Sequence, residues 1–197
     1  MTTKRDLLLA SLCLLVIAIA SLLVNDFLFK PKENWKTYRN ERYGFSFSYP
    51  KDWLIWEWAT PDAGVNGSIV SLRSPETERL FQKGEIYPAS SYNLTISFWP
   101  SINNEYARGG GFYGEKSHKS LAEYFTDKDT FKSKEKIGDL TIAGQKAHEV
   151  IIGGAGASYG VMIEYKGIYQ LSFETAWDKS QLGSTEKQIL STFRFLK

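Results

Sequence analysis

The chain has 197 residues, of which 24 are lysine or arginine and 22 are aspartate or glutamate, so its formal net charge is +2. A charge this close to neutral gives no basic footprint for nucleic-acid binding, and we expect no nucleic-acid partner. The single cysteine, Cys13, lies in an apolar run, so the rest of the chain has no disulfide and no cysteine-ligated metal. The length after that run suits one domain. Its stability must come from packing, largely of aromatic side chains.

The N-terminal segment Leu7 to Val24 is continuously apolar and follows Lys4 and Arg5. At ~1.5 Å rise per residue, such a segment forms a helix close in length to the ~30 Å hydrocarbon core of a bilayer. After a short tail of residues 1–6, we therefore expect a single-pass transmembrane signal-anchor over residues 7–24 that holds the chain in a bacterial cell membrane. Because long domains translocate largely regardless of flanking charge, we expect the C-terminal domain to be extracytoplasmic.

Two other interpretations of this segment can be compared residue by residue. Cleavage after Ala20 fits the small residues that precede it, but the apolar run continues beyond that position, where a mature N-terminus is normally polar. Cleavage remains open as the alternative to an anchor. A lipoprotein signal is disfavoured because bulky Leu12 precedes Cys13.

After the anchor, residues 25–37 show neither helical nor strand periodicity and are expected to be a tether to one globular domain, residues 38–197. From Tyr43 to Tyr49 aromatic and small polar residues alternate, which predicts a half-buried strand that ends at Pro50. Further strands are expected over residues 53–59, 68–73, 93–99, 134–142, 146–152, 161–165 and 168–174.

Short helices are predicted between these strands. One is expected over residues 75–83, and capping boxes predict others that begin at Ser120 and at Thr185. Lys166-Gly167 predicts a hairpin, in which a two-residue loop would place Met162 opposite Leu171. The connections are too short for parallel crossovers. The expected fold class is therefore α+β, a largely antiparallel β-sheet with helices packed on both faces.

Residues at the two ends of this domain resemble the PsbP-like family, bacterial membrane-anchored relatives of the extrinsic photosystem II subunit. The first stretch is an aromatic-Gly-Phe-x-Phe-x-x-Pro strand followed by tryptophan, and the others are the helix after Ser120 and the C-terminal segment. They comprise Tyr43, Gly44, Phe45, Phe47, Pro50, Trp53, Ser120, Leu121, Tyr124 and Gln188 to Leu196. The resemblance implies an α/β/α sandwich over about residues 37–197. The metal-binding His and Asp of the photosynthetic members have no counterpart here, so it implies no metal role.

One motif matches a catalytic signature in its letters. Gly156 to Gly160 has the G-x-S-x-G spacing of a nucleophile elbow, with Ser158 as the nucleophile. The elbow needs a helix after the serine, whereas a strand is predicted there, and both His118 and His148 precede Ser158 instead of following it. The glycine spacings also fit no phosphate-binding loop, and two separated histidines make no metal site. We therefore expect no enzyme activity, no nucleotide, no metal and no cofactor.

Three tryptophans are candidate ligand-binding residues. Trp56 and Trp58 share one strand face, and Trp99 points away from the apolar face of its strand. They can pack beneath helices or form a stacking surface for sugars. The favoured function is a non-enzymatic binding or assembly module with a protein or cell-wall partner. A carbohydrate or cell-wall binding domain is the alternative, and a serine hydrolase at Ser158 is the less favoured second alternative.

Overall fold

The computed structural model describes residues 34–58, 67–86, 92–100, 118–127, 134–153, 157–174, 176 and 178–197. The predicted membrane anchor (residues 7–24), the possible cleavage site after Ala20 and all but the last residues of the tether lie outside this set. Among the residues that are described, no helix combines the length and the apolar character that crossing a bilayer requires.

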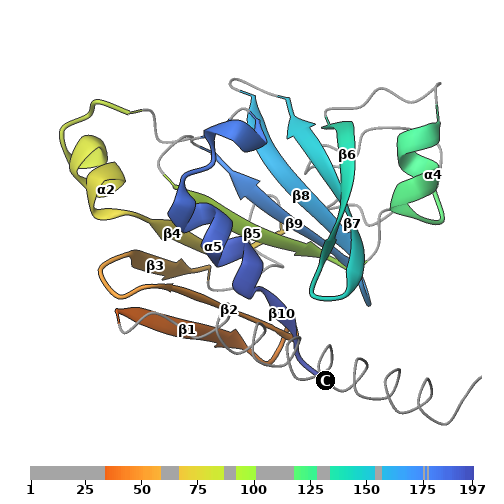
Figure 1. The fold of residues 1–197 in the computed structure, drawn as a ribbon, viewed down its shortest axis with the longest axis horizontal. Helices are drawn as coiled ribbons and strands as arrows, with labels where there is room; N and C mark the ends of the chain where they lie inside the picture. The colour runs from red at the N-terminus through yellow and green to blue at the C-terminus, as the bar shows by residue number, and fades with distance from the viewer. Residues whose placement is uncertain are drawn as a thin grey trace, which may run out of the picture. The chain divides into compact units, whose positions relative to one another are not determined.

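The strands form two sheets (Figure 1). Neighbours whose register is defined are all antiparallel, which confirms the prediction of a largely antiparallel structure with few helices. The smaller sheet has the order β1 (Trp35–Asn40), β2 (Phe45–Pro50) and β10 (Arg194–Phe195). The larger one has the order β3 (Leu54–Glu57), β4 (Ser68–Arg73), β5 (Leu94–Trp99), β9 (Ile168–Phe173), β8 (Ser158–Glu164), β7 (Gln145–Ile152) and β6 (Lys134–Ile142). The smaller sheet was not predicted as a separate layer.

Helix α2 (Pro75–Gln82) lies where it was predicted, and the hydroxyl of its N-cap Ser74 accepts the Thr77 N–H at 3.1 Å. Helix α4 (Leu121–Thr126) has the predicted serine cap, because the Ser120 hydroxyl accepts the Glu123 N–H at 3.2 Å. The Glu123 carboxylate accepts the N–H of Lys119 and so contributes to the cap one residue before the expected position.

The C-terminal helix α5 (Ser184–Thr192) begins earlier than predicted, after a 3₁₀ turn, η3 (Lys179–Gln181). Its N-cap is Gly183, which makes no side-chain cap, so the prediction of a capping box at Thr185 was wrong. Glycine is an acceptable N-cap because its backbone readily adopts the extended geometry, and Thr185 then falls inside the first turn.

The main core joins the two sheets through aromatic side chains. Phe45, Phe47 and Tyr49 of β2 are 0%, 1% and 7% exposed, which confirms their predicted burial. The ring of Phe193, at the end of α5, stacks on Phe45 with 5.5 Å between centroids. Phe45 in turn meets Tyr169 of β9 edge-on at 6.0 Å. Strand β2, helix α5 and the larger sheet are therefore held by one continuous aromatic contact.

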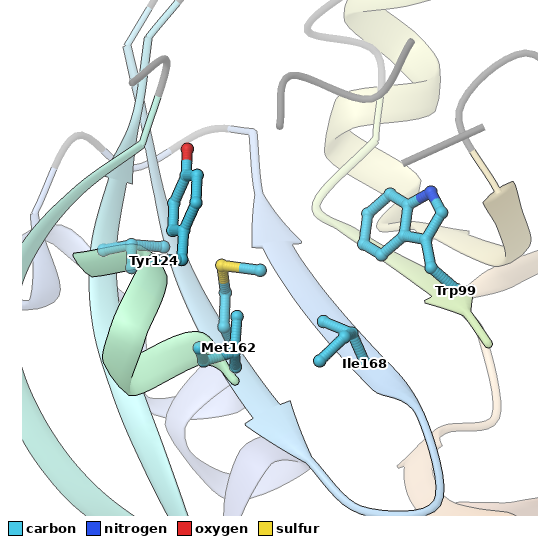
Figure 2. Packing of buried hydrophobic residues seen from close by; sticks show 6 residues of the cluster. Trp99, Tyr124, Met162 and Ile168 are labelled. Atoms are coloured by element: carbon cyan, nitrogen blue, oxygen red, sulfur yellow. The ribbon is translucent and has the colours of Figure 1, made fainter. Parts of the chain in front are cut away.

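A second apolar cluster lies against α4 (Figure 2). Tyr124 of α4 stands beside Met162 of β8, and Ile168 and Trp99 extend the cluster to the ends of β9 and β5. The Leu121 N–H donates to the Glu164 carboxylate at 3.0 Å, which fixes the start of the helix on β8.

The β8–β9 hairpin differs from the prediction by one residue. Glu164 pairs with Ile168, so the loop has three residues, and Met162 lies opposite Gln170 instead of Leu171. Lys166 and Gly167 have φ values of 52° and 143°, which accommodate the extra residue. Because side chains alternate between faces, this shift moves Gln170 to the face that carries Met162.

Candidate functional site

A pocket of about 530 Å³ lies where five segments distant in sequence meet. The segments are the turn between β1 and β2, Gly67 just before β4, the end of β5, the β8–β9 hairpin and the last residues of the chain. Its aromatic lining consists of Tyr43, Phe98, Trp99, Tyr165 and Tyr169. Its charged lining consists of Glu41, Arg42, Lys166 and Lys197. A volume of this size is typical of small-molecule sites.

Hydrogen bonds fix the backbone around the pocket. Gly44 has a φ of 66°, a left-handed turn that glycine adopts without strain, and its carbonyl accepts the Leu196 N–H at 2.8 Å. The Tyr169 hydroxyl donates to the carbonyl of Tyr43. Burial raises the pKa of Tyr169 to about 12, so this donor stays protonated at neutral pH. The β1–β2 turn is thus tied to both β9 and the C-terminal segment.

The aromatic rings of the pocket pack against one another. The centroids of Tyr43 and Phe98 are 5.4 Å apart, and those of Phe98 and Tyr169 are 4.9 Å apart. Tyr165 packs on Phe195 at 4.3 Å. Tyr43, Phe98 and Tyr165 all remain partly exposed. Such packing limits ring motion, so the pocket offers apolar surface that is already ordered.

Positive charge prevails among the charged side chains of the pocket. The Arg42 guanidinium lies 5.5 Å from the centroid of the Tyr43 ring, and the Lys166 Nζ lies 5.3 Å from that of Tyr165. The Glu41 carboxylate forms an ion pair with the Arg39 guanidinium, which offsets its charge. In the described part of the chain, Arg42, Lys166 and Lys197 form no ion pair with a carboxylate.

The structure does not bring the three predicted tryptophans together. Trp99 is 1% exposed and lines the pocket, whereas Trp58, the residue that follows the edge strand β3, is 43% exposed. The Trp58 indole N–H donates to the Ser71 hydroxyl at 3.1 Å. Trp56 of β3 pairs with Ser71 of β4, which pairs with Thr95 of β5, so these three side chains are on one face of the sheet. Trp99 is four residues beyond Thr95 on β5 and is therefore on the same face, two strands away from Trp56. Ligand binding by these three side chains stays a prediction.

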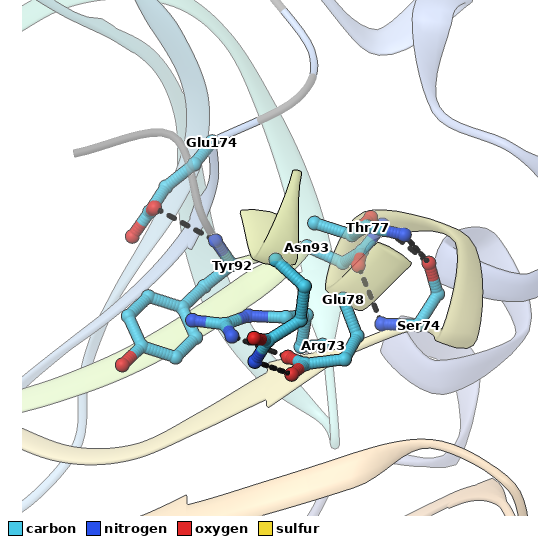
Figure 3. Close-up of polar contacts among 8 residues, drawn as sticks. Arg73, Ser74, Thr77, Glu78, Tyr92, Asn93 and Glu174 are labelled. Carbon is cyan, nitrogen blue, oxygen red and sulfur yellow. Dashed lines mark hydrogen bonds and ion pairs between the residues drawn. The ribbon is translucent and has the colours of Figure 1, made fainter. Parts of the chain in front are cut away.

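Trp56 packs against a buried arginine. The Arg73 guanidinium lies 4.6 Å from the Trp56 ring centroid, 4.1 Å from that of Phe81 and 4.8 Å from that of Tyr92. Its side chain is 4% exposed and forms an ion pair with Glu78 (Figure 3). We call Arg73 with these three rings the arginine cage. A face of Trp56 is therefore covered by another side chain of the same domain.

A buried carboxyl lies beside the arginine cage. Glu174 accepts the Thr95 hydroxyl at 2.8 Å. It also accepts the Tyr92 N–H at 3.3 Å (Figure 3). Burial raises the pKa of Glu174 to about 7, and the two hydrogen bonds and Arg73 only partly oppose this effect. The carboxyl is thus close to half protonated at neutral pH.

The residues of the other sequence motifs lie apart from the pocket. Ser158 is the first residue of β8, and the strand continues to Glu164 where a nucleophile elbow would require a helix. Each histidine bonds to its own carboxylate, His118 to Asp127 at 3.0 Å and His148 to Asp139 at 2.6 Å. Across the described ranges, no three metal-ligating side chains gather in one place.

The sequence did not identify Arg42, Tyr165 or Lys166 as candidate binding residues. A weak signal was present, because a cation, a tyrosine and a glycine are adjacent in both Arg42-Tyr43-Gly44 and Tyr165-Lys166-Gly167. Each triplet forms a turn with a positive φ. That the two turns meet at one pocket depends on the pairing of the sheets, which neither triplet encodes by itself.

Among solved structures, the chain is similar to the solution structure of cyanobacterial PsbP (CyanoP) from Synechocystis sp. PCC 6803. The match covers 85% of this chain and 95% of that chain, with 14% sequence identity and a TM-score of 0.45. CyanoP is a PsbP protein, and the sequence motifs of this chain resemble the PsbP-like family. No family profile matches the chain, and no curated protein matches it.

Proposed function

We propose that this chain is a membrane-tethered, extracytoplasmic and non-enzymatic binding or assembly module, and that the pocket at the β8–β9 hairpin is its binding site. The observation that carries the proposal is the pocket itself. Its described lining combines ordered aromatic rings with cations that no carboxylate pairs, groups that bind a ligand without transforming it. The apolar segment of residues 7–24 supports the tether.

The location can be tested on intact cells. We expect added protease to digest the domain while the N-terminal tail stays protected, and the mass of the purified protein to include residues 1–20. Protection of the domain or its recovery in the cytosol would refute the topology. A mature N-terminus at Ser21 would replace the anchor by a cleaved signal peptide.

Binding can be tested by blocking the pocket. Leu196 lines it and is partly exposed, so Leu196→Trp should reduce its volume. In a thermal-shift screen of small molecules with the full chain, we expect compounds that stabilise the wild type and lose their effect in this variant. Leu54→Trp is the matched control, because Leu54 is 42% exposed on β3 and does not line the pocket. Compounds that act equally on all three proteins would place binding elsewhere.

Trp58 supports the second candidate, a carbohydrate or cell-wall binding domain. Its 43% exposed indole lies one residue beyond the edge strand that carries exposed Leu54, which gives a small apolar surface open to a sugar ring. Titration of wall polysaccharides should then shift the tryptophan fluorescence, and Trp58→Ala should abolish the shift. A shift that persists in Trp58→Ala, or no shift with any glycan, would remove this candidate.

A further inference from the structure

We infer that the pocket takes a compact amphiphilic anion: a small apolar or aromatic body that carries one carboxylate or phosphate group. The inference rests on the proposed function, because it assigns a ligand class to the same pocket. It follows from two properties of the lining, the charge of its polar side chains and the packing and exposure of its aromatic rings.

The charge favours an anion. Among the lining side chains, Arg42, Lys166 and Lys197 contribute three cations, against the one carboxylate of Glu41. Arg39 holds that carboxylate, whereas the three cations lack a carboxylate partner anywhere in the described residues. A ligand anion would therefore gain charge-assisted hydrogen bonds without first breaking an ion pair of the protein.

The positions of two cations make them ready to bind. Arg42 lies over the Tyr43 ring and Lys166 over the Tyr165 ring, so each charge is held near the pocket by an aromatic face. Both rings are themselves part of the lining. The same arrangement argues against a cationic ligand. The ring faces that would attract it already have a cation beside them, and two like charges would repel it.

The rings favour an apolar body on that anion. Tyr43, Phe98 and Tyr165 are partly exposed and packed, so they offer apolar surface that loses little side-chain freedom on binding. An inorganic anion would leave this surface in water. A ligand with both parts would cover the rings and reach the cations together.

A matched pair of probes separates the two contributions. Naphthalene-2-carboxylate and naphthalene-2-carboxamide have the same ring system and nearly the same shape, but only the first is charged. We would titrate both against the full chain in nanodiscs of zwitterionic lipid, follow binding by ligand-observed NMR, and subtract empty nanodiscs. The carboxylate should bind about threefold to tenfold more tightly than the amide, a difference that shrinks in high salt.

Variants then assign the preference to residues. Arg42→Gln and Lys166→Gln should each weaken carboxylate binding by part of that preference, about twofold to threefold, and leave carboxamide binding unchanged. Glu41→Gln should tighten carboxylate binding, because it removes the one side-chain carboxylate of the lining. Lys51→Gln is the matched control. Lys51 is exposed and follows β2 at the end opposite to Gly44, so its loss should change neither probe.

The outcomes distinguish the inference from the proposed function. If both probes bind equally and Leu196→Trp removes both, the pocket is a binding site but the anion preference is wrong. If neither probe binds, or Leu196→Trp changes neither, both ideas fail. Replacing the carboxylate by 2-naphthyl phosphate identifies the preferred anion. Tighter binding of the phosphate favours a phosphate monoester, and equal or weaker binding favours a carboxylate.

Discussion

The domain places a cation against aromatic rings in two regions that use this chemistry differently. In the arginine cage, Arg73 is 4% exposed, contacts three rings and forms an ion pair with Glu78. At the pocket, Arg42 and Lys166 each lie over one ring, are exposed, and form no ion pair within the described residues. A buried cation whose charge is paired within the domain contributes to folding. An exposed cation without an ion-pair partner in the described residues is available to a ligand.

The comparison also explains why a tryptophan pattern is a poor guide to a ligand surface. Trp56 has the strand position expected of a stacking residue, but the guanidinium of Arg73 covers it. Tyr43 and Tyr165 were not candidates, yet they remain partly exposed in the pocket. The difference between Trp56 and the two tyrosines is whether another buried side chain of the domain already covers the ring.

The largest effect should come from the main aromatic core, which joins the two sheets. Phe193→Ala is expected to lower the free energy of unfolding by about 3 to 5 kcal/mol, because the buried ring stacks on Phe45 and its removal leaves a cavity. Both regions should then unfold in one transition in a urea melt followed by circular dichroism. Leu54→Ala, at an exposed position, is the control. A change below about 1 kcal/mol for Phe193→Ala would contradict the assigned core.

Loss of the buried cation should come next. Arg73→Ala is expected to cost about 3 kcal/mol, because it leaves Glu78 without its ion-pair partner and three rings without their central contact. The same melt measures it. Arg79→Ala is the control on α2, the helix that carries Glu78. Arg79 forms an exposed pair with Glu76, so its loss should change the free energy of unfolding little. Equal losses in the free energy of unfolding for Arg73→Ala and Arg79→Ala would mean that the arginine cage does not stabilise the fold.

The carboxyl beside the cage predicts a pH dependence. Because the pKa of Glu174 is raised to about 7 in the folded protein from an unfolded value of 4.5, the folded state holds this proton more tightly. Its contribution to stability should therefore be fully present below about pH 4.5, decline as the pH rises to about 7, and then stay constant. Glu174→Gln should remove this part of the slope and stabilise the protein by about 1 to 3 kcal/mol at pH 8.

Urea melts of wild type and Glu174→Gln at pH 5 and pH 8 measure this difference. Glutamine keeps an oxygen that can accept from Thr95 and from the Tyr92 N–H, so the two proteins should be similar at pH 5. Glu41→Gln, at an exposed carboxylate outside this region, is the control. A variant less stable than wild type at pH 8 would show that the charged carboxylate supports the fold.

Much of the fold could be predicted from local patterns. The aromatic alternation from Tyr43 to Tyr49 predicted β2, and the Ser120 cap predicted α4, because each signal lies within a few consecutive residues. The two-residue β10 is too short to show a period. The register of the β8–β9 hairpin was wrong by one, since it depends on the backbone angles of Lys166 and Gly167 and on contact with Phe98.

The pocket could not be predicted in this way. Its lining comes from residues 41–44, 67, 98–100, 165–166, 169 and 196–197, which only the pairing of strands brings together. The sequence did identify Trp99 and Tyr43, one as a candidate ligand residue and the other within a family-like strand. It could not show that both line one pocket, because the first lies at the end of β5 and the second in the turn before β2.

The smallest effect on stability is expected at the pocket, and it is the sharpest test of the comparison. Arg42→Gln should change the free energy of unfolding by less than about 1 kcal/mol, because an exposed cation over a single ring contributes little to folding. Urea melts at low and high salt would measure it, with Arg73→Ala run alongside.

Arg42→Gln combined with Lys166→Gln should lower the free energy of unfolding by no more than the sum of the single changes. In the described part of the domain, neither cation has an ion-pair partner that its loss would leave unpaired. A loss as large as that of Arg73→Ala would make Arg42 a structural residue. The two regions would then use their cations in the same way, and the pocket cations would no longer be available to a ligand.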